Sequence, residues 1–151
     1  MPEVTKILFA LEISGISPKI TPWVKYMVQK FQAELHVIHV VPDMGYWGVP
    51  YASDYMLEKD KEGLLNKARA MADEFCLEHL GTEIKPVVHV VAGHPADEIT
   101  KYAGTSHADI IIMGTHGKRG LDRALFGSVA DQVLRLSPVP VFCINPSRTK
   151  P

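Results

Sequence analysis

The chain has 151 residues, of which 46% are hydrophobic and 22% charged, an ordinary composition for a globular protein. This length predicts one domain, residues 1–151, with a core large enough to fold alone. Sixteen basic and seventeen acidic side chains leave a formal charge of −1. These nearly equal numbers of basic and acidic residues give no reason to expect a nucleic-acid binder or a membrane-surface protein.

The cysteines and the apolar segments bear on where the protein works. Cys76 and Cys143 are far apart and form no CxxC motif, which argues against a zinc ribbon or a thioredoxin-like site. The first residues do not resemble a signal peptide, and no apolar run approaches the roughly 18 residues that span a bilayer. We therefore expect a cytoplasmic protein without a membrane segment.

Apolar runs alternate with helix-period patterns along the whole chain. In chain order, the pattern predicts a strand at 6–11, a helix at 18–31, a strand at 34–41, a helix at 55–80, a strand at 85–92, a helix at 96–106, a strand at 108–113, a helix at 128–136 and a strand at 138–144. In the first helix the apolar residues are Trp23, Val24, Met27, Val28 and Phe31. In the second, Leu64, Ala68, Met71 and Phe75 form one stripe.

Strict alternation of apolar strands with helices predicts an α/β protein with a parallel sheet covered on both faces. Right-handed crossovers leave few topologies, so we expect a doubly wound, flavodoxin- or Rossmann-like sheet of five strands in the order 3-2-1-4-5. Ligands of such sheets bind beyond the carboxyl ends of the strands, where the order reverses. Here that point lies between the first and fourth strands.

Between the fourth strand and the last helix lies a loop rich in glycine and basic residues, MGTHGKRGLDRALFGS. Gly114, Gly117 and Gly120 let backbone N–H groups approach an anion without a Cβ in the way. Gly127 and Ser128 then open a helix, whose first N–H groups favour negative charge. This pattern favours a phosphate site, although Gly127-Ser128 would equally serve as a plain helix N-cap.

The spacing of these residues resembles the universal stress protein family. Gly114-x-x-Gly117, nine further residues and Gly127-Ser128 match the G-2x-G-9x-G-[ST] pattern of its nucleotide-binding members. The first strand, the fourth strand and the closing segment with SPVPV are also similar to the family. The resemblance implies a dimeric, ATP-binding protein that acts as a switch or sensor in the stress response.

The resemblance also implies roles for single residues. Ala10 and Leu11 would lie near the base or ribose, Val41 would contact adenine through its backbone, and the loop would hold the phosphates. The full set of nucleotide-binding residues that we expect is Ala10, Leu11, Glu12, Val41, Met113, Gly114, Gly117, Arg119, Gly120, Arg123, Gly127, Ser128 and Val129. Glu12 stands where the family usually has Asp, and it could bind Mg²⁺ or Mn²⁺ together with the phosphates.

No residue pattern indicates a fast enzyme. Glu12 and His116 are the only candidates for positioning a hydrolytic water, so slow ATP hydrolysis or autophosphorylation stays open. A second alternative is a dimeric scaffold that binds no nucleotide. His36 and His39 are three apart on a strand and point to opposite faces, so they cannot share a metal. For His94 and His116 we expect ordinary loop histidines.

Two further segments suggest contacts. Tyr46, Trp47 and Tyr51 follow the second strand and would form a lid, a partner surface or packing over the sheet edge. The last strand, Val139–Ile144, is apolar, and Pro140 within it favours an edge position. Pairing of this strand with its copy in a second chain would satisfy both edges, which predicts a homodimer. The sequence does not identify a further protein partner.

Overall fold

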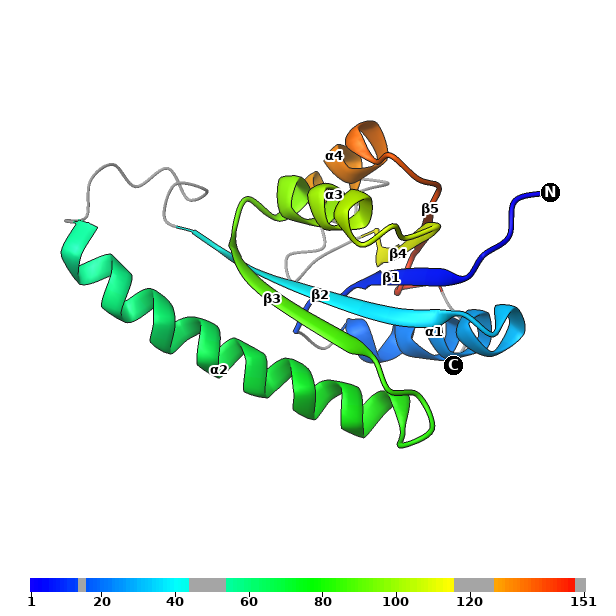
Figure 1. Ribbon diagram of the computed structural model, residues 1–151, viewed down its shortest axis with the longest axis horizontal. Helices are drawn as coiled ribbons and strands as arrows, with labels where there is room; N and C mark the ends of the chain where they lie inside the picture. Colours follow the sequence, from blue (N-terminus) through cyan, green and yellow to red (C-terminus); the bar gives the residue numbers. More distant parts are fainter. Residues whose placement is uncertain (14–15, 44–53, 116–126, 149–151) are drawn as a thin grey trace.

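The computed structural model describes residues 1–13, 16–43, 54–115 and 127–148, with residues 54–59 described by their backbone only. Strands and helices alternate along the chain, as Figure 1 shows. The elements are β1 Lys6–Ala10, α1 Ser17–Phe31, β2 Glu34–Pro42, α2 Asp54–Leu80, β3 Val87–Gly93, α3 Pro95–Thr105, β4 Ile110–Gly114, α4 Ser128–Leu136 and β5 Val141–Ile144. Within the described residues, no helix is long and apolar enough to cross a membrane.

The five strands form one parallel sheet in the order β3-β2-β1-β4-β5, which confirms the predicted topology. β1 lies in the centre, with Ile7 beside Leu35 of β2 and Ile110 of β4. The central strands are buried on both faces, because helices cover each side and β-branched residues fill the space. β5 and β3 are the two edges.

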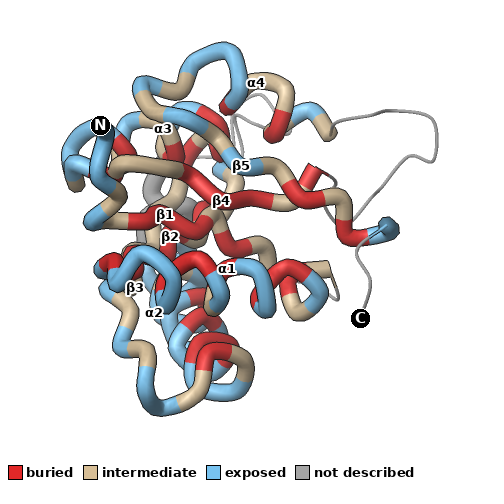
Figure 2. The backbone as a smooth tube through the Cα atoms, turned by 90° about the vertical axis from the view of Figure 1, so that its right-hand side faces the viewer, coloured by how far each residue is buried: buried red, intermediate tan, exposed pale blue. Residues whose placement is uncertain are grey.

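Successive side chains of each strand enter two separate cores. Phe9 and Val37 pack under α1 and α2, whereas Leu8 and Ile38 pack under α3 and α4. Figure 2 shows the resulting layers, with the buried strands between the two helix pairs. This arrangement follows from the two-residue period of a strand.

The buried face of α2 differs from the predicted stripe. Ala68 and Phe75 are buried as expected, but Leu64 is 56% exposed and Met71 is 41% exposed. The helix instead buries Ala72, Cys76 and Leu80, so its contact face is rotated from the one predicted. Small side chains such as Ala72 let the helix lie close to the sheet, and this close approach leaves the larger Met71 at the border.

The predicted face of α1 also needs correction at both ends. Val24, Met27 and Val28 are buried, together with Ile20, but Trp23 is 43% exposed and Phe31 is 45% exposed. The apolar pattern alone did not separate the side chains that face the sheet from apolar side chains at the exposed border of the helix. The last strand begins at Val141, later than predicted, because Ser137 Oγ donates to the carbonyl of Val139 in a local turn. Pro138 and Pro140 have no N–H to offer a ladder.

Candidate functional site

The strand order reverses between β1 and β4, and the two ends of these strands lie side by side in the sheet. β1 pairs with β2 as far as Ala10 and Ile38, but β2 continues to Pro42 beside β3. β2 therefore runs past the end of β1 and leaves a step at the carboxyl edge. Such a step at a reversal of strand order is where doubly wound folds bind their ligands.

The N-terminus of α4 is held at this edge by backbone hydrogen bonds. The Gly127 N–H donates to the carbonyl of Thr115, and the Thr115 N–H donates to Ile144 in β5 with an N···O distance of 2.9 Å. Gly127 has an extended conformation and provides no side-chain cap to the helix. Gly127 therefore offers no side-chain acceptor to the first-turn N–H groups, and the helix dipole favours an anion there.

The turn after β1 is held at the same edge. The Leu11 N–H donates to the carbonyl of Ile38, with an N···O distance of 2.8 Å. Nδ1 of His39 lies 2.9 Å from the carbonyl oxygen of Leu11, and the Ser17 hydroxyl donates to the carbonyl of Glu12. These contacts fix the direction in which the chain leaves β1.

The predicted residues fall into three groups. Ala10, Glu12, Val41, Gly114, Gly127 and Val129 are half-buried at the carboxyl edge or at the start of α4, and Ser128 is exposed. Leu11 and Met113 are buried, with side chains in the two cores, so they offer the edge only their backbones. Gly117, Arg119, Gly120 and Arg123, like the histidine at 116 and the aromatics at 46, 47 and 51, lie outside the described residues.

Sequence reasoning missed two residues of this edge. Thr115 is 5% exposed and joins α4 to β5 through its backbone, although it stands inside the glycine motif. Its place directly after the fourth strand was an available signal. His39 was considered only as a metal ligand, and its contact with Leu11 depends on pairing between β1 and β2.

The other histidines make separate contacts. His36 Nδ1 lies 2.9 Å from the hydroxyl of Tyr102 on α3, and its Nε2 lies 3.0 Å from Glu34 Oε1. His94 precedes α3, and its Nδ1 lies 3.6 Å from Asp97 Oδ2. No group of three or more metal-ligating side chains occurs among the described residues.

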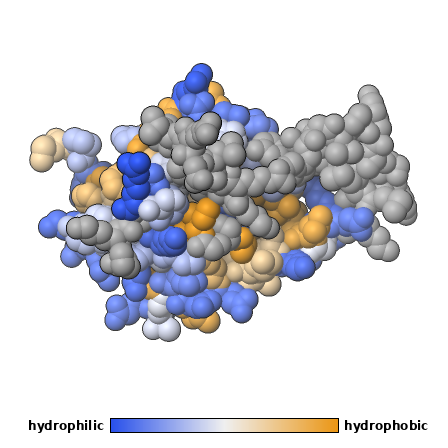
Figure 3. All heavy atoms as spheres, turned by 180° about the vertical axis from the view of Figure 1, so that it is seen from behind, coloured by the Kyte–Doolittle hydropathy of each residue, from blue (hydrophilic) through white to orange (hydrophobic). Residues whose placement is uncertain are grey.

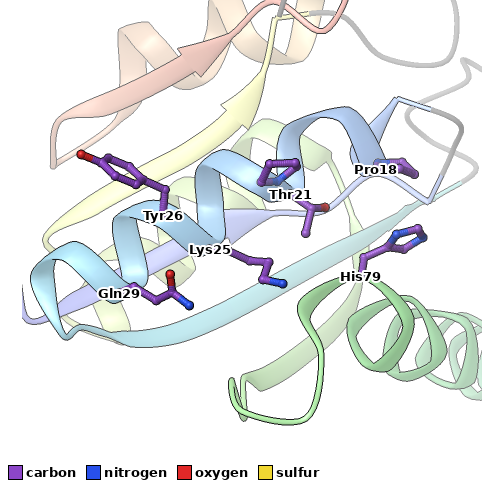
Figure 4. A pocket seen from close by; sticks show the side chains of 7 residues that line it. Pro18, Thr21, Lys25, Tyr26, Gln29 and His79 are labelled. Atoms are coloured by element: carbon purple, nitrogen blue, oxygen red, sulfur yellow. The ribbon is translucent and has the colours of Figure 1, made fainter. Parts of the chain in front are cut away.

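A hollow of about 390 Å³ lies elsewhere, between α1 and the end of α2 (Figure 4). Pro18, Thr21, Pro22, Lys25, Tyr26 and Gln29 of α1 line it, together with His79 of α2. None of the predicted nucleotide residues that the structure describes lines this hollow. We assign the candidate site to the carboxyl edge, because there two chain turns and a helix N-terminus converge where the strand order reverses.

Fold and edge together define a doubly wound α/β protein with a helix N-terminus beside its central strands. Residues 3–145 match the model of the Universal stress protein family, and the chain belongs to this family. The universal stress protein MJ0531 of Methanocaldococcus jannaschii is 31% identical over 145 residues, which cover 93% of this chain and 81% of that protein.

Two solved structures illustrate the likeness. The structure of MJ0577, a universal stress protein of the same organism, superposes with a TM-score of 0.82 and 28% identity, covering 95% of this chain and 97% of that one. A universal stress protein of Archaeoglobus fulgidus in complex with dAMP gives a TM-score of 0.57 at 21% identity, covering 93% and 98%. The latter identity supports the shared fold alone.

Proposed function

We propose that this protein binds ATP at the carboxyl edge of its sheet and acts as a nucleotide-dependent switch in a cytoplasmic stress response. The observation that carries the proposal is the hydrogen bond from Gly127 to Thr115, which holds the N-terminus of α4 where the strand order reverses. Membership of the family supports it, since the A. fulgidus relative has been solved with an adenine nucleotide.

The donors present fit a phosphate chain. The N–H groups of the first turn of α4 point along the helix axis, and Ser128 adds an exposed hydroxyl beside them. Asp131 also lies in this turn, but its carboxylate is paired with Arg135 at 3.2 Å, which reduces its repulsion of an anion. Gly114 and Gly127, with Gly117, Gly120, Arg119 and Arg123 of the loop, would surround the phosphates in this proposal.

The base and ribose would lie along the step between β1 and β2. There β2 continues past β1, so Val41 lies three residues beyond Ile38, the partner of Ala10, on the part of β2 that extends past the end of β1. Glu12 supplies one carboxylate, and one carboxylate plus phosphate oxygens is a common way for a protein to hold Mg²⁺. A divalent ion would thus arrive with the nucleotide, and Glu12 would be its protein ligand.

The proposed switch is a change in residues 114–127 on binding. Phosphates bound between the glycines and α4 would tie this segment to the sheet, and a partner protein would distinguish the two forms. The test is hydrogen exchange of the segment with and without Mg-ATP. Stronger protection with nucleotide is expected, and equal protection in both states contradicts the switch.

Turnover of the nucleotide is not part of the main proposal. Glu12 is the one described residue that we consider for positioning a water, so we expect at most slow hydrolysis or autophosphorylation. ADP formed in proportion to protein, and lost when Ser128 is changed to alanine, would indicate such an activity. The longer side chain of Glu12 favours the other alternative, a scaffold without nucleotide.

We also propose that two copies pair through β5. This strand is an edge of the sheet, and its Phe142 is 38% exposed. Phe142 lies against the exposed Trp23 of α1, with ring centroids 6.5 Å apart, and Tyr26 adjoins Trp23. An apolar edge strand bordered by aromatics is a surface that pairing with an identical strand would cover.

The direct test of nucleotide binding has two stages. Freshly purified protein is denatured, and the released small molecules are separated by anion exchange, where stoichiometric ATP, ADP or AMP is expected. Protein freed of ligand is then titrated with Mg-ATP by calorimetry, with Mg-GTP as the matched control for the base. No bound nucleotide and no heat at millimolar Mg-ATP would favour the scaffold alternative.

A further inference from the structure

His39, within β2, links this strand to the turn that follows β1. Its Nδ1 lies 2.9 Å from the carbonyl oxygen of Leu11, twenty-eight residues away in the sequence. A carbonyl oxygen only accepts hydrogen bonds, so Nδ1 must carry the proton and donate it. The contact thus fixes the position of Leu11 and the tautomer of His39 together.

The same turn has two further anchors, and a third hydrogen bond, inside α1, holds Ser17. The Leu11 N–H donates to Ile38, so both backbone polar groups of Leu11 are held by neighbouring residues of β2. The hydroxyl of Ser17 donates to the carbonyl of Glu12, and the hydroxyl of Thr21 donates to the carbonyl of Ser17 at 2.9 Å. Of these anchors, His39 alone joins β2 to the turn through a side chain.

Burial favours the neutral form of the His39 ring. Burial lowers the pKa of His39, while the bond to Leu11 and the charge of Glu12 oppose this effect in part. A neutral ring with its proton on Nδ1 makes a fixed, directed donor. Without that donor, the carbonyl of Leu11, whose side chain is 4% exposed, would lose a partner beside the core.

We propose that His39 is a positioning residue of the nucleotide site. By donating from Nδ1 to Leu11, it holds the turn Ala10–Glu12 in the conformation that receives the base, ribose and metal before they arrive. His39 acts through this turn and is not assigned a contact with the ligand. The inference rests on the proposed function, because it assumes that ATP binds at this edge.

Three variants separate the donor from the bulk of the ring. In His39→Asn the amide nitrogen falls close to the position of Nδ1, so the donor is kept. In His39→Leu a side chain of similar width fills the space without a donor, and His39→Gln places its amide further out, near Nε2. In His39→Leu and His39→Gln the turn is no longer held by a donor at the position of Nδ1. If it then adopts its binding conformation one-tenth of the time, the dissociation constant for Mg-ATP rises about tenfold.

Calorimetric titration with Mg-ATP is paired with hydrogen exchange of the Leu11 amide in the ligand-free protein. We expect His39→Asn to match the wild type in both measurements. His39→Leu and His39→Gln should bind about tenfold more weakly and exchange Leu11 faster, with circular dichroism unchanged. Wild-type affinity in His39→Leu overturns the proposal, and so does an equal loss in His39→Asn, since ring packing would then be what matters.

Hydrogen exchange of the Leu11 amide tests the role of His39 without nucleotide, so it distinguishes a failure of this inference from a failure of the proposed function. If the wild type binds no nucleotide, the proposed function fails, and exchange of Leu11 alone decides whether His39 holds the turn. Faster exchange in His39→Leu but not in His39→Asn still supports the positioning role, whereas equal exchange overturns it. If His39→Leu does not fold, the comparison of His39→Asn with His39→Gln decides in its place.

Discussion

The backbone N–H of Gly127 donates a hydrogen bond to the carbonyl of Thr115, which sets the start of α4 directly beside the end of β4. The two residues enclose the eleven residues 116–126, so the contact closes the ends of this segment on one another. Through Thr115 the link continues to Ile144 of β5. The helix N-terminus is therefore fixed relative to the sheet.

Charge at the start of α4 is the first test of this arrangement. Gly127 has φ −68° and ψ 165°, which any residue adopts, and aspartate is a good N-cap there. We expect Gly127→Asp to keep or raise the melting temperature but to weaken ATP binding at least about tenfold, because its carboxylate repels phosphate. Calorimetry and thermal unfolding measure the two effects.

The matched control for this change is Gly127→Asn, which caps a helix as well as aspartate but carries no charge. Its affinity should fall less than that of Gly127→Asp. Equal losses in both variants would indicate that side-chain size rather than charge disturbs the site. Unchanged affinity in Gly127→Asp would place the phosphates elsewhere.

Asp109 joins the start of β1 to β4 and should contribute stability that depends on pH. Its Oδ2 accepts hydrogen bonds from the N–H of Thr5 and of Lys6, both at 2.8 Å, and from the Thr5 hydroxyl at 3.0 Å. The two backbone bonds hold the pKa of Asp109 below its usual value. We expect Asp109→Asn to cost about 1 kcal/mol at pH 7, since the carboxylate is close to solvent.

The sign of the pH dependence follows from the lowered pKa. The stabilisation is complete above the pKa of the unfolded chain, near 3.9, and is lost as the pH falls through the lower pKa of the folded state. Urea unfolding of both proteins at pH 7 and at pH 3 measures the difference. The difference in the free energy of unfolding between the wild type and Asp109→Asn should be smaller at pH 3 than at pH 7. If this difference is the same at both pH values, the ionised carboxylate is not its source.

Phe142 tests the proposed dimer. A glutamate at this edge would place a charge in the apolar contact between two β5 strands, so Phe142→Glu should shift the protein from dimer to monomer in sedimentation velocity. Leu77→Glu on α2 is the control, because Leu77 is even more exposed, at 66%, and lies away from this edge. A dimer that persists in Phe142→Glu does not pair through β5.

Neighbouring positions on α2 test the observed face of this helix. Ala72 is fully buried, so Ala72→Leu adds three carbon atoms to a filled core and should destabilise the fold by about 1–3 kcal/mol. Met71 lies at the border and is 41% exposed, so Met71→Lys should change the stability by less than about 0.5 kcal/mol. Chemical denaturation measures the stability of both variants. If Met71→Lys is more destabilised than Ala72→Leu, the result supports the stripe expected from the sequence.

Exposed apolar side chains occur over much of the described surface. In the view from behind (Figure 3), hydrophobic and hydrophilic residues are interspersed around the atoms drawn in grey. Leu134 and Leu136 on α4 are exposed like Phe142, without lying on an edge strand. Exposure alone therefore does not single out an interface, and the edge position of β5 together with the adjoining Trp23 distinguishes Phe142 from these two leucines.

The sequence by itself determined the order of elements, the parallel sheet and the family. Strand and helix periods are local properties, because neighbouring residues alternate faces or recur every turn whatever lies beyond them. The spacing Gly114, Gly117 and Gly127-Ser128 is also local, and it indicated the family that the comparison with residues 3–145 confirmed. The roles of these glycines remain predictions.

The tertiary structure decided what depends on residues far apart. Whether Met71 or Ala72 faces the sheet depends on how closely α2 approaches its neighbours, because the sequence places apolar side chains at both positions and the predicted stripe included only Met71. The contact of His39 with Leu11 exists only once β1 and β2 are paired, and that of Gly127 with Thr115 only once α4 has folded back onto the end of β4. A hydrogen bond has a length and a direction in space, and a one-dimensional pattern carries neither.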